Sequence, residues 1–192
     1  IVEFWYTLNN HCVFTSEIKP GCWAKTSLQF FINYEIKVKL DKKLLFKYNP
    51  NYNNQKIFIS LESKALGDTI AWFAYIEEFQ KKYNCKIVCS TFWNQLFLKE
   101  YPSIDFVDPG STVESLYGMF SIGWFENKKG FRHPNDPRTI PLQKVATDIL
   151  GLEYKERKPK IFVKTSERKI KEKYICISTA ASAQAKYWNY PN

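Results

Sequence analysis

The sequence predicts an α/β protein in which a small antiparallel β module precedes a parallel sheet with helical connections. Two observations lead to this prediction. Residues 1–48 contain short runs with the alternation and the turn residues of β hairpins. From residue 57 onward, apolar runs of strand length alternate with stretches of helical periodicity, which is the pattern of parallel βαβ units. A segment rich in Asn, residues 49–54, separates the two patterns.

The N-terminal segment predicts β structure throughout. We expect a hairpin where two strand-like runs, 2–6 and 13–15, flank the turn-forming pair Asn9-Asn10. Residues 28–40 are rich in β-branched and aromatic side chains and predict a further strand. Near its end, apolar residues alternate with lysines, so one face of the strand should be buried and the other solvated. The apolar positions are Ile36, Val38 and Leu40.

Buried strands joined by helices are expected in the rest of the chain. Residues 57–61 form a continuous apolar run, as in a strand covered on both faces. Residues 68–83 carry apolar side chains near helical spacing. A second helix, 141–150, begins with Pro and ends at Gly151. The other expected elements are strand 86–89, helix 93–100, strands 104–107, 119–124 and 161–163, a charged helix at 167–173, and strand 174–177.

Charge is unevenly distributed along the chain. The net charge is +9, from 28 Lys and Arg against 19 Asp and Glu, and the excess is concentrated at residues 155–173. Nucleic acid, an anionic membrane surface and a phosphorylated small molecule all fit such a field, and so does a merely solvated helix and linker. A hydrophobic content of 45% excludes disorder by composition. No apolar run approaches the roughly 18–20 residues of a membrane span, so none is expected.

Cysteine and histidine usage bears on the compartment and on metal binding. The five cysteines are widely spaced and include no CxxC pair, which argues against a disulfide framework and a local zinc site. We therefore expect a reducing, cytoplasmic compartment. Cys85 and Cys89 fall on one face of a strand and should pack in the core. His11 and His133 are too far apart in the sequence for a His-based site, so no metal is predicted.

A short loop after the first buried strand carries the first candidate site residues. In residues 64–69, Gly67 allows a ligand to approach the backbone, since it has no Cβ. Asp68 should stand at the N-terminus of the following helix, where the helix dipole favours its ionised form. A carboxylate in this position can accept a proton from a hydroxyl group. The alternative is that Asp68 simply caps the helix.

A second loop, residues 178–188, follows the last expected strand. It is rich in small and hydroxylated residues, and Lys186 supplies a compact positive charge suited to phosphate. Neither GxxxxGK[ST] nor GxGxxG occurs in the sequence, so a P-loop or dinucleotide site is not supported. A base after one parallel sheet and a phosphate clamp at the start of another is the layout of a two-domain transferase with its site in the cleft between the domains.

These loops resemble those of a known enzyme family. The sequence Leu66-Gly67-Asp68-Thr69-Ile70 resembles the LGD-type loop of ADP-heptose glycosyltransferases of the GT-B fold, and Lys186-Tyr187-Trp188 resembles their K-x-W-P motif. The closer resemblance is to the bacterial autotransporter heptosyltransferases, dodecameric enzymes that O-glycosylate autotransporter adhesins, and it spans essentially the whole chain. Its further segments are 18–26, 90–94, 122–125, 141–151 and 183–188.

The resemblance implies an inverting, metal-independent transfer of a sugar from a nucleotide-diphosphate donor such as ADP-heptose to a protein Ser hydroxyl or a glycan. Asp68 matches the catalytic base of the family. Lys186 and Ser182 match contacts to the donor phosphates, and Gly67 is placed with them. No DxD metal motif is seen. The family's iron, held by a four-cysteine finger, is not carried over, because the cysteines of this chain do not match it.

The resemblance also implies a domain division. Residues 1–50 are the antiparallel β module, 51–165 a Rossmann-like acceptor-side domain, and 166–192 a linker and the truncated start of the nucleotide-sugar domain. The chain lacks an initiator Met and ends just after a strand-like run, so we expect a piece of a longer protein that is inactive by itself. Two departures from the family are Ala74, where Pro is frequent, and the Asn189-Tyr190 pair before Pro191.

Two other functions stay open at this stage. The chain could be a noncatalytic carbohydrate-binding or assembly module in which residues 1–48 make protein contacts, and exposed aromatic residues on that sheet would support this. It could instead be a basic nucleic-acid-binding domain that uses residues 155–173, although no known nucleic-acid-binding motif is present. Under the preferred hypothesis the partners are the nucleotide-sugar donor, an acceptor protein or glycan and further copies of the chain, without nucleic acid.

Overall fold

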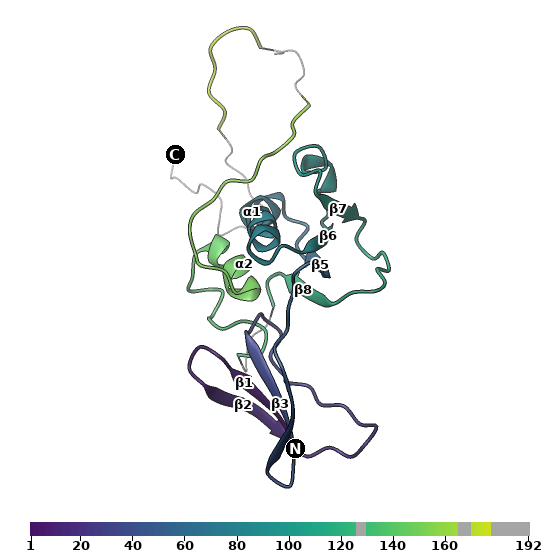
Figure 1. Cartoon of the computed structure of the whole chain (residues 1–192). Coiled ribbons are helices and arrows are strands. Elements are labelled where there is room, and N and C mark those ends of the chain that lie inside the picture. Colours follow the sequence, from purple (N-terminus) through teal and green to yellow (C-terminus); the bar gives the residue numbers. More distant parts are fainter. Residues whose placement is uncertain (126–129, 165–169, 178–192) are drawn as a thin grey trace. The chain divides into compact units, whose positions relative to one another are not determined.

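The computed structural model describes residues 1–125, 130–164 and 170–177. Ile1–Phe162 form one compact unit, and Val163–Asn192 form another. The first unit contains two four-stranded sheets, one antiparallel and one parallel (Figure 1). The predicted fold class, an antiparallel module followed by a Rossmann-like parallel sheet, is thereby confirmed. Neither described α-helix is long and apolar enough to cross a membrane.

Two hairpins form the antiparallel sheet. Its strands are β1 (Val2–Tyr6), β2 (His11–Ser16), β3 (Tyr34–Leu40) and β4 (Lys43–Tyr48), in the order β2-β1-β3-β4. The expected first hairpin is confirmed, and Asn10 takes φ 49° in its turn. In the second hairpin the two turn residues, Asp41 and Lys42, have φ values of 47° and 66°. Positive φ at both positions matches the twist of the flanking strands.

The strand expected at 28–40 is shorter than predicted, because residues 28–33 are not β structure. Their backbone groups find partners in other elements: the Phe31 N–H donates to Ile149 O at 2.8 Å. The Phe31 ring packs beside Phe79, with the ring centroids 6.2 Å apart. This segment therefore joins the core of the α/β half instead of extending a sheet.

The prediction that one face of β3 is buried is wrong at the end of the strand. Leu40 is 60% exposed, because it directly precedes the exposed turn at Asp41. Ile36 and Val38 are only partly buried. The alternation of apolar residues with lysines therefore predicted the strand correctly and overestimated how deeply its apolar face is covered.

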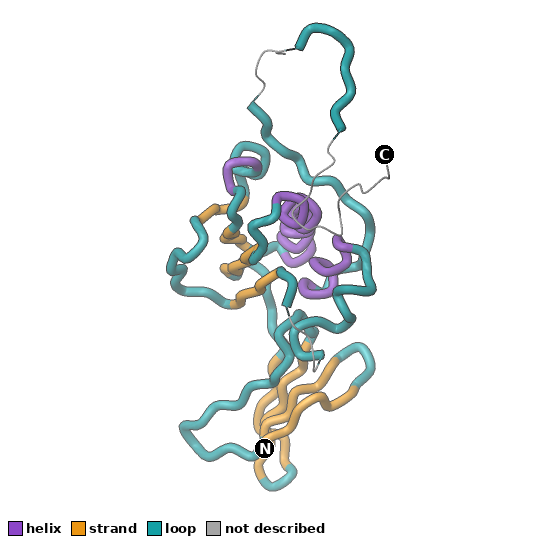
Figure 2. The backbone as a smooth tube through the Cα atoms, turned by 180° about the vertical axis from the view of Figure 1, so that it is seen from behind, coloured by secondary structure: helices purple, strands orange, loops and turns teal. Residues whose placement is uncertain are grey.

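The parallel sheet follows the expected βαβ pattern. Its strands are β5 (Lys56–Leu61), β6 (Lys86–Ser90), β7 (Ile104–Val107) and β8 (Gly118–Ile122), in the order β7-β6-β5-β8, with all pairs parallel. Helices α1 (Leu66–Tyr83) and α2 (Leu142–Leu150) both lie on one side of this sheet, as the two opposite views show (Figures 1 and 2). They also contact each other. The five elements expected at 57–61, 68–83, 86–89, 104–107 and 141–150 are confirmed, and strand 119–124 is formed with shifted ends.

Aromatic side chains fill the space between α1 and the sheet. Trp72, Phe73 and Phe79 of α1 are fully buried. The Phe73 ring stacks on Phe97 with 3.7 Å between centroids and 5° between planes. Each buried aromatic ring removes a large apolar area from water, so this layer accounts for much of the stability of the α/β half. Cys89 is also fully buried and Cys85 nearly so, which confirms the expectation that both pack in the core.

The prediction of a helix at residues 93–100 is wrong. A 3₁₀ turn, η1 (Asn94–Leu96), takes its place. The Asn94 side chain explains the difference, since its Oδ1 accepts from the N–H and the hydroxyl of Thr91 while its Nδ2 donates to Val107 O. These bonds hold the segment against the ends of β6 and β7, which a continuous helix would not allow.

The two strands expected near the end of the chain are not formed within the described residues 161–164 and 170–177. Ile161 packs against the core without forming a strand, and the Phe162 N–H donates to Leu96 O. Ile175 is 84% exposed, so its side chain is not covered by the described part of the chain. The charged helix expected at 167–173 is absent from residues 170–173, and its remainder lies outside the described part.

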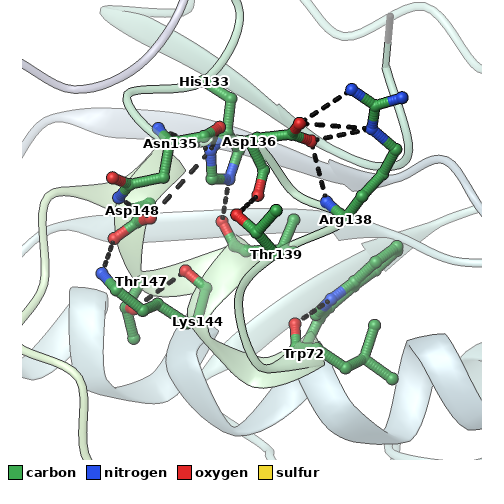
Figure 3. Close-up of polar contacts among 11 residues, drawn as sticks. Trp72, His133, Asn135, Asp136, Arg138, Thr139, Lys144, Thr147 and Asp148 are labelled. Atoms are coloured by element: carbon green, nitrogen blue, oxygen red, sulfur yellow. Dashed lines mark hydrogen bonds and ion pairs between the residues drawn. The ribbon is translucent and has the colours of Figure 1, made fainter. Parts of the chain in front are cut away.

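A polar cluster fixes the segment before α2 against that helix (Figure 3). His133 is 3% exposed, and its two ring nitrogens lie 2.7 Å from Asn135 O and 3.3 Å from Val145 O. Asn135 Nδ2 donates to Asp148 at 2.6 Å, and Lys144 pairs with the other oxygen of the same carboxylate. His133 is thus a buried structural residue that ties the loop to the helix.

Gly151 is required at the end of α2, and this requirement can be tested. It takes φ 62°, and a Cβ there would overlap Phe31 Cδ1 and lie 2.8 Å from Phe31 Cγ. We expect Gly151→Ala to lower the free energy of unfolding by about 1–2 kcal/mol for the left-handed backbone, and by roughly 1–3 kcal/mol more for overpacking. Urea unfolding of the two proteins measures the difference.

Gly130 provides the matched control. It has a similar φ of 67°, but nothing lies within 4 Å of a Cβ placed there. Gly130→Ala should therefore show only the backbone cost of about 1–2 kcal/mol. Equal losses in the two variants would contradict the close packing of Phe31 against Gly151.

Candidate active site

The candidate site lies at one edge of the parallel sheet. The carboxyl ends of β5, β6 and β8 share this edge because the strands run in the same direction. β6 and β7 lie on one side of β5, and β8 lies on the other. The strand order thus reverses between β5 and β8, and ligands of open parallel sheets bind beyond the carboxyl ends at such a point. We call residues 62–68 and 123–125, which follow these two strands, the switch-point site.

Asp68 stands in the switch-point site, in the first turn of α1, and is partly exposed. The free N–H groups of a helix N-terminus carry partial positive charge, which favours an anion there. The alternative that Asp68 is the helix cap is wrong, because the N-cap position is occupied by Ala65 and no side-chain hydrogen bond caps the helix. The carboxylate is therefore available for other partners.

Two donors bind the same oxygen of Asp68. Ser63 Oγ donates to Oδ2 at 2.6 Å, and Trp124 Nε1 donates to Oδ2 at 2.9 Å. Ser63 Oγ also accepts the Ala65 N–H at 3.1 Å, so its single proton is directed at the carboxylate. Ser63 comes from the loop after β5 and Trp124 from the loop after β8. The carboxylate is thus held from both sides of the switch point.

The buried core supports Trp124. Its ring lies 6.1 Å from the ring of Trp72, between centroids. Trp72 is fully buried, and its Nε1 donates to Leu142 O, at the start of α2, at 2.9 Å. Trp124 itself is 50% exposed. One part of the indole is therefore supported by the helix pair, while another part faces solvent beside the carboxylate.

The loop after β6 adds further aromatic residues at the same edge. Phe92 is 40% exposed, and Lys64 Nζ lies 5.5 Å from its ring centroid. Trp93 Nε1 donates to Lys64 O at 3.0 Å, which ties the loop after β5 to the loop after β6. The edge therefore presents a carboxylate, an ammonium group and aromatic faces together.

The glycines of the site differ in how tightly they are packed. Gly67 is exposed, and nothing lies within 4 Å of a Cβ placed there, so its backbone is open to a ligand. At Gly123, a Cβ would lie 3.0 Å from both Glu62 Cβ and Phe125 Cζ. Gly123 thus lets the two loops of the switch-point site approach each other.

A cavity of about 440 Å³ opens beside these loops. Glu62 and Phe125 line it, each adjacent in sequence to one of the two donors that hold Asp68. Gln29, Ser121 and Arg132 add an amide, a hydroxyl and a guanidinium group to its wall. A few polar groups beside aromatic faces are the features of a site that orients a polar ligand.

The predicted phosphate contacts and the cysteines complete the list of candidates. Lys186 and Ser182 lie outside the described residues, so their predicted roles stay predictions.

Within the described part of the chain, no group of three or more His, Cys, Asp or Glu side chains could hold a metal ion. Burial raises the pKa of the Cys85 thiol to about 11 and raises the pKa of Cys89 as well, so both thiols stay protonated at neutral pH.

The basic stretch 155–173 is used partly within the fold. Arg157 forms an ion pair with Glu78 of α1 at 3.0 Å, and Lys155 O accepts the hydroxyl of Tyr75 at 2.9 Å. These contacts favour a structural role for the beginning of the stretch over a free nucleic-acid-binding surface.

Comparison with known proteins finds relatives that extend over nearly the whole of this chain. No protein-family model matches the sequence. The autotransporter heptosyltransferase Aah of Escherichia coli is 32% identical over 186 residues, which cover 94% of this chain and 47% of Aah. TibC, the autotransporter heptosyltransferase of E. coli O78:H11, is 28% identical over 94% of this chain and 45% of TibC. The chain is a homologue of the autotransporter heptosyltransferases.

The solved structures agree with this relationship. The dodecameric iron-containing heptosyltransferase TibC, in complex with ADP-D-β-D-heptose, matches 99% of this chain with a TM-score of 0.88 and 26% identity. A second crystal structure of TibC, described as a bacterial iron-containing dodecameric glycosyltransferase, gives a TM-score of 0.86. The match covers 50% of each TibC chain, so this chain shares the fold of about half of that glycosyltransferase structure. The chain spans about half the length of the curated relatives it matches.

Similarity to these relatives does not by itself decide activity. A relative from Burkholderia thailandensis, 25% identical over 93% of this chain, is named an inactive autotransporter heptosyltransferase, BimC. Activity therefore depends on the residues that each chain places at the position of the switch-point site.

Proposed function

We propose that this chain forms the acceptor side of a glycosyltransferase, in which Asp68 is the general base. The donor is a nucleotide-diphosphate sugar such as ADP-heptose, and the acceptor is the hydroxyl group of a protein Ser or of a glycan. One observation supports this assignment most directly: the partly exposed Asp68 carboxylate stands at the switch point of the sheet, oriented by Ser63 and Trp124. The homology to heptosyltransferases supports the choice of donor.

The reaction is a single displacement with inversion at the anomeric carbon. Asp68 accepts the proton of the acceptor hydroxyl while the hydroxyl oxygen forms its bond to that carbon. The bond from the anomeric carbon to the diphosphate oxygen breaks, and its electron pair leaves with the nucleoside diphosphate. In this proposal Lys186, the Ser182 hydroxyl and the open backbone at Gly67 stabilise the charge on the departing diphosphate, so no metal ion is assigned to that role.

The surroundings of Asp68 support an acceptor that carries hydroxyl groups. The cavity beside Glu62 and Arg132 offers both an acceptor and donors of hydrogen bonds. The exposed part of the Trp124 ring provides an apolar face of the kind that packs on a sugar or a peptide. In this proposal, an acceptor that extends from this cavity past Trp124 presents its hydroxyl to the Asp68 carboxylate.

Replacement of Asp68 tests the proposal. Asp68→Asn keeps the size of the side chain and removes the base, so we expect the full-length protein to lose at least about 100-fold in kcat. The measurement is the rate at which ADP-heptose adds one heptose to a purified autotransporter passenger domain, followed by mass spectrometry. Melting temperatures of the two proteins should agree within a few degrees.

Asp105→Asn is the matched control, because Asp105 is an exposed carboxylate on β7, away from the switch-point site. It should transfer heptose at the rate of the unmodified protein. Full activity of Asp68→Asn would remove Asp68 from the role of base, and absence of transfer by the unmodified protein would place this chain with the noncatalytic members.

Lys186 is expected to bind the donor diphosphate. A lost charge-assisted contact to phosphate weakens binding by roughly tenfold or more, so Lys186→Ala should raise the Kd for ADP-heptose by that factor. Isothermal titration calorimetry measures it. Lys171→Ala, a change at an exposed lysine of the basic stretch, should leave the Kd unchanged. An equal effect of both variants would mean that overall charge, and not a specific clamp, attracts the donor.

We further propose that the protein assembles with copies of itself through β4. This edge strand is exposed along its whole length, and four of its side chains are large and apolar: Leu44, Leu45, Phe46 and Tyr48. An open edge with exposed apolar side chains is a surface that further chains pair with. The dodecameric state of TibC supports self-association.

A substitution at the irregular position of β4 tests this assembly. Leu45 has no cross-strand partner in the β3–β4 register, so Leu45→Glu leaves the ladder intact while placing a charge on the edge. We expect the oligomer to dissociate in light-scattering measurements, whereas Lys43→Glu on the same strand should keep it. An unchanged mass for Leu45→Glu would exclude β4 as the contact surface.

A further inference from the structure

The two oxygens of the Asp68 carboxylate have different surroundings. Oδ2 accepts two hydrogen bonds, from Ser63 Oγ at 2.6 Å and from Trp124 Nε1 at 2.9 Å. Among the residues that the structure describes, no group donates to Oδ1. The carboxylate thus has one oxygen committed to the protein and one that is open.

The geometry points to Oδ1 as the atom that takes the proton from the acceptor, with Ser63 and Trp124 as positioning residues that hold Oδ2. This inference rests on the proposed function and names the parts of the site that orient the base. Two bonds to one oxygen fix the rotation of the carboxyl group about its Cβ–Cγ bond. The lone pairs of Oδ1 then keep one direction while the acceptor exchanges.

Both donors are themselves held in place. The Ser63 hydroxyl accepts the Ala65 N–H at 3.1 Å while it donates to Asp68 Oδ2, so two hydrogen bonds hold its oxygen in place. The Trp124 ring is supported by the buried Trp72, which is bonded to Leu142 O. Preorganised donors of this kind cost no reorganisation during the reaction, which is what makes such positioning effective.

The chemical nature of the donors suits a base. A hydroxyl and an indole N–H are neutral, so they orient the carboxylate without cancelling its charge. Within the described residues, no Lys or Arg side chain forms an ion pair with Asp68. A guanidinium partner would bind both oxygens and compete with the acceptor proton.

The proton balance of the step is simple. The acceptor hydroxyl gives its proton to Oδ1, and the oxygen keeps the electron pair of the O–H bond and uses it to bond the anomeric carbon. The diphosphate leaves with the electron pair of the broken C–O bond. Asp68 ends as a neutral carboxylic acid, with the proton on Oδ1 and both donors still on Oδ2.

Removal of each donor separately tests the inference in the full-length protein. Trp124→Phe keeps an aromatic ring and deletes the indole N–H together with the five-membered ring, while Ser63→Ala deletes the hydroxyl. We expect each change to lower kcat for heptose transfer by about tenfold, as for a lost hydrogen bond to a charged group, with KM for the acceptor changed less than about threefold. Ser63→Thr keeps the hydroxyl and should restore most of the rate.

Trp5→Phe is the matched control, because Trp5 Nε1 also donates to a carboxylate, that of Glu3, at 2.7 Å, but in the antiparallel sheet. It should leave kcat unchanged. Equal losses in kcat for Trp5→Phe and Trp124→Phe, or a change confined to KM, would overturn the positioning role.

Asp68→Asn separates this inference from the proposed function. If Asp68→Asn is inactive while Trp124→Phe and Ser63→Ala keep full kcat, Asp68 is the base but the two donors do not position it. If Asp68→Asn is fully active, the role of Asp68 as base is contradicted, and the inference is overturned with it. Thermal melting of each variant, expected within a few degrees of the unmodified protein, ensures that a rate loss is not a loss of fold.

Discussion

The parallel pairing of β5 with both β6 and β8 is the constraint on which the rest of the structure depends. β5 is one of the two interior strands, with Ile57, Ile59 and Leu61 in the core that α1 and α2 cover. Because β8 joins on the side opposite β6, the chain segments after β5 and β8 emerge side by side although about 60 residues separate them. This placement brings Asp68 and Trp124 within hydrogen-bond distance, and no local sequence feature could do so.

The same constraint links stability to chemistry. Trp72 is a core residue, and yet its indole holds the start of α2 and supports the ring that contacts Asp68. The polar cluster around His133 fixes the segment that leads from the switch-point site into α2 (Figure 3). The carboxylate is therefore oriented in part through contacts with the buried core, which helps to hold a base in one geometry.

Sequence patterns predicted the elements whose signals are local. The apolar run of β5, the periodicity of α1 and the Gly at the end of α2 each specify their own structure. The patterns failed where a partner distant in the sequence or a side chain decides the local structure. At residues 28–33, the Phe31 N–H bonds to Ile149 O instead of to a neighbouring strand. At η1, hydrogen bonds of the Asn94 side chain replace those of a helix. Asp68 was recognisable from its position after a buried strand. Ser63 and Trp124 were not, because the pairing of β5 with β8 brings them together. The one signal for Trp124 was its place in the resemblance segment 122–125, which did not indicate its role.

A structure of the full-length protein with ADP-heptose and a bound acceptor tests the central claim most directly. The account predicts the acceptor hydroxyl at roughly 2.6–3.2 Å from Asp68 Oδ1, the distance of a proton transfer, with Trp124 and Ser63 still bonded to Oδ2. An acceptor hydroxyl bonded to a different side chain, with the Asp68 carboxylate turned away from the anomeric carbon, would contradict it.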